Sequence, residues 1–192
     1  MNDRKTLFKM RKWQYNFLSN EALMRKYSQG HADAFECLYL RNKTQLLNFI
    51  KRQCHNTSIA EELVHDTWMA VITQASSYQE KAKFTTWLFR IAHNRLIDHW
   101  RKHGNSAAIL IDEIGQQLLS KSHEVSDPVI EVEDISRQLS SLSVEQMEVV
   151  LLRIEGFSHL EIAEITNSKP ETVKSRLRYA TKRLRTSMEL SV

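Results

Sequence analysis

The chain has 192 residues, of which 42% are hydrophobic and 26% are charged, a composition typical of a globular protein rather than a chain disordered throughout. It has only four glycines and two prolines, which disfavours a β-sheet protein, because sheets need turn residues at short intervals, and indicates long helices. The formal net charge of +4 favours a polyanionic partner.

The N-terminal segment, residues 1–20, is predicted to be a basic arm. Leu7 and Phe8 are followed at once by Lys9, so the apolar core that a signal peptide needs is missing. No segment approaches the length of a membrane span, and Cys37 and Cys54 lie in helical stretches without the density of a disulfide scaffold. We therefore expect a cytoplasmic protein with reduced thiols and no membrane insertion.

Apolar residues at steps of three and four predict three helices, over about 34–50, 59–75 and 85–102. The second helix carries a polar patch near its start, formed by Glu61, Glu62, His65 and Asp66. The third is expected to bury a stripe formed by Trp87, Leu88, Ile91, Ala92 and Leu96. Its other side presents Arg90, His93, Asn94, Arg95 and Arg101.

Residues 104–134 mix acidic and small polar residues with Pro128 and lack a sustained apolar stripe. This pattern predicts a linker, with a short helical piece over about 112–119. The expected fold is therefore all-α, with two small helical domains, 21–103 and 135–192, joined by the flexible linker.

Three helix starts downstream share the capping-box pattern, in the pairs Ser143 with Gln146, Ser158 with Glu161 and Ser168 with Glu171. In this motif a serine hydroxyl and a reaching Glu or Gln satisfy backbone N–H groups that have no helical partner. Gly156 is predicted to end the first of these helices, because glycine enters the left-handed region without steric cost.

The segment 159–178 is a candidate helix-turn-helix. Ala163 is the small residue that a close crossing of two helices needs, and Asn167, four residues on, tolerates the positive φ of the turn. Val173 is the branched residue on which the second helix packs back, followed at helical steps by Leu177 and Leu184.

With that face buried, the second helix presents an opposite face that is basic and polar, formed by Lys169, Thr172, Lys174, Ser175, Arg176 and Arg178. Arginine can pair bidentately with guanine, and short hydroxyls reach bases or phosphates. A solvated charged helix in a plain bundle is the alternative, but the small residue, the turn and the basic face together favour DNA binding.

Four stretches, 21–39, 60–68, 84–102 and 171–177, resemble the extracytoplasmic-function (ECF) group of bacterial RNA polymerase sigma factors. The resemblance extends over about 21–185 and implies a factor that directs transcription initiation with core RNA polymerase and has no enzymatic activity. His31 stands where the family usually has aspartate, and His65 where it more often has glutamine. An anti-sigma factor is a further expected partner, and this expectation rests only on the resemblance, because members of the family commonly have one.

The resemblance also implies residue roles. The patch of Glu61, Glu62, His65 and Asp66 would bind the polymerase, and the basic face of residues 169–178 would read the −35 element. The loop 78–83 would capture a flipped base of the −10 element while the following helix guides the opened strand. The −10 contacts expected are Tyr78, Lys81, Lys83, Arg90, Asn94, Arg95 and Arg101. Trp87 is a candidate melting wedge, but its place in the apolar stripe favours a core role.

Two other functions fit part of the chain. Glu62 and His65 have the spacing of half a di-iron helical site, but the sequence has no second Glu-x-x-His, so we expect no metal and no cofactor. An ordinary DNA-binding regulator would use the same helix-turn-helix. It would leave the polar patch at 60–66 and the long helix at 85–102 unexplained.

Overall fold

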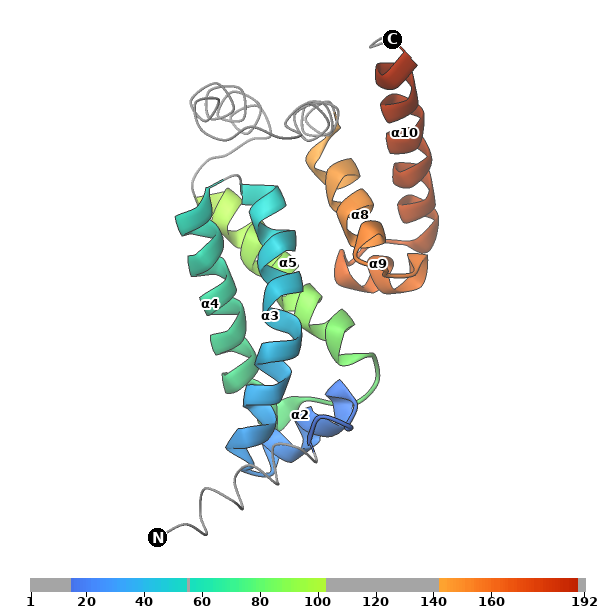
Figure 1. Cartoon of the computed structure of the whole chain (residues 1–192). Coiled ribbons are helices and arrows are strands. Elements are labelled where there is room, and N and C mark those ends of the chain that lie inside the picture. Colours follow the sequence, from blue (N-terminus) through green and yellow to red (C-terminus); the bar gives the residue numbers. More distant parts are fainter. Residues whose placement is uncertain (1–14, 55, 103–141, 190–192) are drawn as a thin grey trace, which may run out of the picture.

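The computed structural model describes residues 15–54, 56–102 and 142–189 (Figure 1). All the regular structure of these residues is helical, which confirms the all-α prediction. The predicted linker with its short helix at 112–119, and residues 1–14 of the basic arm, lie outside the described residues.

In the described part of the chain, the first unit has four helices: α2 (Asn20–Ser28), α3 (Ala32–Cys54), α4 (Thr57–Thr73) and α5 (Phe84–Lys102), with the 3₁₀ turn η1 (Ala75–Ser77) before α5. The helix α3 packs against the other three, and α4 also packs along α5 (Figure 1). Their apolar faces meet in a core that buries Leu38, Phe49, Leu63, Leu88 and Leu96. The stripe predicted for residues 85–102 lies in this core, except that Trp87 is only half-buried at its edge.

Cys37 and Cys54 both belong to α3, and both are buried cysteines outside any disulfide in the described chain. Burial disfavours the charged thiolate and raises the pKa of Cys54 to about 12. Cys54 therefore serves the core as a small apolar side chain.

The described residues of the second unit form three helices: α8 (Val144–Ile154), α9 (His159–Ile165) and α10 (Pro170–Glu189). The capping boxes predicted at Ser143 and Ser158 are both present at the starts of α8 and α9. Gly156 ends α8 as predicted, at a φ of 94°. Beyond it, the Phe157 N–H donates to the Leu152 carbonyl at 3.1 Å, which closes the helix end.

The third predicted capping box, at Ser168, is wrong. The helix α10 begins at Pro170, so the preceding Lys169 takes the N-cap position, and its carbonyl accepts from the Val173 N–H at 3.2 Å. Proline suits the first helical position because its φ is already helical and it has no N–H to satisfy. Ser168 lies one residue further out, where its hydroxyl is 2.8 Å from that of Thr166.

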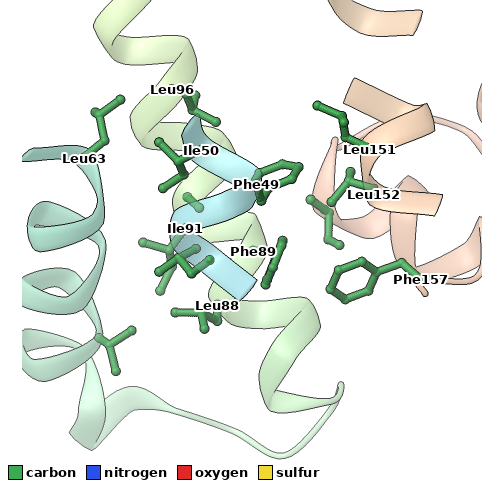
Figure 2. Close-up of a cluster of buried hydrophobic side chains, with 14 of the residues drawn as sticks. Phe49, Ile50, Leu63, Leu88, Phe89, Ile91, Leu96, Leu151, Leu152 and Phe157 are labelled. Atoms are coloured by element: carbon green, nitrogen blue, oxygen red, sulfur yellow. The ribbon is translucent and has the colours of Figure 1, made fainter. Parts of the chain in front are cut away.

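The two units pack against each other, and the main contact is between α5 of the first unit and α9 of the second. Phe89 joins them, with its ring centroid 5.0 Å from that of Phe49 and 4.8 Å from that of Phe157. Figure 2 shows Leu151 and Leu152 of the second unit facing the same cluster. The sequence pattern did not predict this contact. It assigned one buried face to residues 85–102, whereas α5 has two.

Candidate nucleic-acid interface

The polar patch predicted on residues 59–75 lies on the exposed face of α4. All four side chains, Glu61, Glu62, His65 and Asp66, are exposed, while Leu63 and Trp68 are buried on the opposite face. The Nδ1 atom of His65 is 3.8 Å from Oδ1 of Asp66. The patch is thus a charged surface that rests on a rigid apolar base and is open to a large partner.

The loop 78–83 connects η1 to α5. The ring of Tyr78 packs on those of Trp87 and Phe84, with centroid distances of 5.0 and 6.3 Å. Its hydroxyl is buried without a hydrogen-bond partner among the described residues. Burial, together with the nearby charges of Glu21 and Glu80, raises the pKa of Tyr78 to about 12. Tyr78 therefore forms a wall of the loop, and its hydroxyl is a donor that is not satisfied within the described chain.

The side chains predicted along the opened strand lie at the surface of α5 and of the loop before it. Arg90, Asn94 and Arg101 are exposed and Arg95 is half-buried, while Lys81 and Lys83 of the preceding loop are exposed. The prediction that His93 belongs with these surface side chains is wrong. His93 is buried, and its Nδ1 atom is 2.5 Å from Oε1 of the buried Glu148 on α8. The second unit covers this part of α5, and an ionisable pair fills the contact.

The segment 159–178 has the helix-turn-helix geometry. Ala163 and Val173 are buried where α9 and α10 cross, and Asn167 has the predicted positive φ, at 47°. The side chains expected to read the −35 element lie outside this crossing: Lys169, Lys174, Ser175 and Arg178 are exposed, and Thr172 and Arg176 are half-buried. Lys174 is paired with Glu171 at 2.9 Å. Four of these six side chains are therefore open to solvent, and Thr172 and Arg176 are partly covered.

A cleft between the units brings together residues from both predicted DNA surfaces. Asn94 and Arg101 of α5 line it with Arg176 of α10, and Glu145 and Glu148 of α8 complete its wall. Its volume is about 510 Å³, within the range of small-molecule pockets and far too small for a DNA duplex. In this arrangement, therefore, the cleft side of Asn94, Arg101 and Arg176 cannot contact duplex DNA.

A second contact between the units involves Lys83, whose Nζ atom is 3.0 Å from Oε1 of Glu161 on α9. Burial alone would raise the pKa of Glu161, but hydrogen bonds from Ser158 and Lys83 outweigh it and lower the pKa to about 2. Glu161 thus acts twice, since its carboxylate also closes the capping box of α9. The sequence showed the capping role but gave no sign of the lysine.

Replacing Glu161 with glutamine is expected to destabilise the fold at neutral pH, by an amount that shrinks as the pH falls. A carboxylate whose pKa is lower in the folded chain stabilises the fold above its unfolded pKa, near 4.5, and this contribution is lost as the pH falls toward 2. Chemical denaturation from pH 7 to pH 3 measures the difference between E161Q and wild type. E164Q, on the same helix but exposed, should match wild type throughout, and a constant E161Q difference would contradict the assignment.

Among the described residues, no three His, Cys, Asp or Glu side chains are grouped closely enough to hold a metal ion. Glu62 and His65, the candidate half of a di-iron site, therefore have no third ligand in the described part of the chain. None of the described helices is both long and apolar enough to cross a membrane.

Comparison with known proteins identifies two family regions in the chain. The Sigma-70 region 2 family matches residues 38–106, and the Sigma-70 region 4 family matches residues 133–184. The RNA polymerase sigma factor CarQ of Myxococcus xanthus is 29% identical over 163 residues, which cover 84% of this chain and 93% of CarQ. The ECF sigma factor SigW of Bacillus subtilis is 26% identical over an alignment that covers 84% of this chain and 92% of SigW.

Two solved structures share the fold. CnrH, in complex with the cytosolic domain of CnrY, superposes with a TM-score of 0.68 at 22% identity, over 90% of this chain and 99% of CnrH. RpoE of Bartonella quintana, in complex with the anti-sigma factor NepR, gives a TM-score of 0.64 at 25% identity, over 82% of this chain and 98% of RpoE. An all-helical chain with region 2 and region 4 of the Sigma-70 proteins is, by class, a transcription initiation factor. More narrowly, this chain belongs to the ECF sigma factors.

Proposed function

We propose that this protein binds core RNA polymerase and directs it to promoters, with α4 as the polymerase-docking surface, α5 and the loop 78–83 as the −10 surface, and α10 as the −35 surface. The observation that carries the proposal is that one chain joins an exposed acidic face on α4 to a helix-turn-helix with a basic face. The working domains are 21–103 and 135–192, the linker is 104–134, and residues 1–20 are an accessory arm.

The division of labour follows from charge. The −10 and −35 surfaces carry lysines and arginines, which displace the counterions that surround DNA phosphates, so promoter binding should weaken steeply with salt. The polymerase-docking surface is acidic apart from His65, so it repels DNA and suits a basic protein surface. The protein contributes recognition and strand opening and no catalytic step of its own. It works in the cytoplasm, where the template and polymerase are.

The deciding experiment is transcription in vitro, with purified chain, purified core polymerase and genomic fragments, followed by mapping of the start sites. Initiation at defined sites only when the chain is present supports the proposal. A chain that binds a duplex tightly without polymerase, and adds no initiation, would instead be an ordinary DNA-binding regulator. Inhibition by an anti-sigma factor, the kind of partner bound to RpoE in its structure, is a further expectation, tested by adding such a protein to the same assay.

Replacing Arg176 with alanine is expected to weaken recognition of the −35 element while binding to core polymerase stays unchanged. Loss of a bidentate contact to a base costs about 1–2 kcal/mol, or about 5- to 30-fold in affinity. The measurement is initiation from the cognate promoter and from one with a substituted −35 element. R183A, which removes the same charge further along α10, should weaken both templates alike. Equal loss of polymerase binding in R176A would contradict the separation of the two surfaces.

A further inference from the structure

The loop 78–83 has little internal support for its shape. Inside this described stretch, the backbone hydrogen bond is the short one from the Lys81 N–H to the Gln79 carbonyl, at 2.8 Å. A loop that binds a flipped base in a pocket binds best when its conformation is already fixed, because ordering a flexible loop on binding costs free energy. The loop must therefore be held by contacts from outside it.

The helix α2 supplies two such contacts. The Oε1 atom of Glu21 accepts a hydrogen bond from the backbone N–H of Phe84, the first residue of α5, at 2.8 Å. This N–H has no partner within its own helix, so Glu21 caps α5 from a different element. One turn along α2, the guanidinium of Arg25 is paired with the carboxylate of Glu80, in the middle of the loop.

The charge on Glu21 is itself stabilised by this arrangement. Burial would raise the pKa of Glu21, but the hydrogen bond from Phe84 and the nearby Lys83 lower it below its usual value. The carboxylate is therefore ionised at neutral pH, which makes the bond to the Phe84 N–H charge-assisted.

The helix α2 is in turn fixed on the rest of the first unit. Asn20 donates from Nδ2 to Oδ1 of the buried Asn42 on α3, at 3.3 Å, and the Ser19 hydroxyl caps the start of α2. Arg41, also on α3, donates to the carbonyls of Tyr15, Asn16 and Leu18, just before α2. Leu23 and Met24 bury the inner face of α2 completely. The helix is thus held on the first unit by hydrogen bonds at its start and by its buried inner face.

We propose that Glu21 and Arg25 are positioning residues for −10 recognition: from α2 they hold the two ends of the segment 80–84, and so set which base the loop accepts. This inference rests on the proposed function, since it assigns a role within promoter recognition. Neither side chain needs to touch DNA for this role. The contact between Arg25 and Glu80 is exposed and contributes little to global stability, so its effect should appear in selectivity rather than in unfolding.

The test uses holoenzyme assembled from core polymerase and each variant, with pairs of templates that differ only in the −10 element. Selectivity is the ratio of initiation from the cognate template to that from the substituted one. E21A, R25A and E80A are each expected to lower this ratio about 3- to 10-fold, the range for loss of one hydrogen bond. Binding to core polymerase and the corresponding −35 ratio should match wild type.

The opposite charges of Arg25 and Glu80 allow a positioning role to be distinguished from simple electrostatic attraction to DNA. R25A removes a positive charge and E80A removes a negative one, so a purely electrostatic effect would move promoter affinity in opposite directions, whereas loss of positioning lowers selectivity in both. The matched control is K26A, which removes the same charge next to Arg25, from a side chain with no ion pair among the described residues. E21Q, whose amide oxygen can still accept from Phe84, should recover most of the selectivity that E21A loses.

Unchanged −10 selectivity in R25A and E80A would overturn the proposal, as would an equal fall in the −35 ratio. If thermal unfolding shows that E21A does not fold, the exposed pair of R25A and E80A decides the question alone. Failure of the proposed function itself would look different, because wild-type holoenzyme would then show no defined start site on any template.

Discussion

Cross-linking the two units through cysteines placed at Arg52 and Glu155 is expected to stop promoter-directed initiation, with a loss of at least about 100-fold. These side chains meet across the units, with Nη1 of Arg52 3.3 Å from Oε1 of Glu155. The positions named −10 and −35 lie about 25 base pairs apart, or about 85 Å of duplex at 3.4 Å per base pair. Surfaces that share one small cleft cannot reach both elements, so the units must separate on the promoter.

The measurement compares initiation by the R52C/E155C variant before and after reaction with a short bismaleimide. The untreated double variant, and each single variant treated with the reagent, should initiate normally, because neither residue lies on a proposed DNA or polymerase surface. Normal initiation by the cross-linked protein would show that the packed arrangement is competent for promoter binding.

Reversing the charge of Asp66 is expected to weaken binding to core polymerase by about 2 kcal/mol or more, or at least about 30-fold, while leaving the DNA surfaces unchanged. Asp66 is exposed at the C-terminal end of the α4 patch, so D66R places a positive charge where the proposed partner surface is itself basic. Because only polymerase-bound protein initiates, transcription should fall with binding and recover when the variant is added in excess.

The affinity of D66R for core polymerase can be measured directly by competition with labelled wild-type protein. E80R changes the charge by the same amount elsewhere on the first unit and should bind polymerase as wild type does. A D66R protein that binds core polymerase normally would remove α4 as the docking surface, even if transcription were lost for another reason.

Much of the fold could be predicted from local sequence patterns. The apolar spacing predicted α3, α4 and α5, and the caps at Ser143, Ser158 and Gly156 predicted both ends of α8 and the start of α9. These features depend on neighbours within a few residues, so a periodicity argument can reach them. The error at Ser168 arose because two local signals competed, and the proline at position 170 determined where α10 begins.

What could not be predicted is the contact between distant segments. Phe89 and His93 lie on a second face of α5 whose partners, Phe157 and Glu148, are more than fifty residues away. Periodicity finds an apolar stripe but not its partner, and it places a histidine on the polar side by default. The pairing of Glu21 with Phe84 was missed for the same reason, since a helix cap donated from another element leaves no pattern of fixed spacing.

The burial of Cys54 has a consequence for how the protein can respond to its surroundings. With a pKa of about 12, only about one molecule in 10⁵ carries the nucleophilic thiolate at neutral pH. Peroxides and disulfide reagents react with that form, so this side chain is chemically silent while the first unit stays folded. Sensing of oxidants through Cys54 would require the helices around it to come apart first.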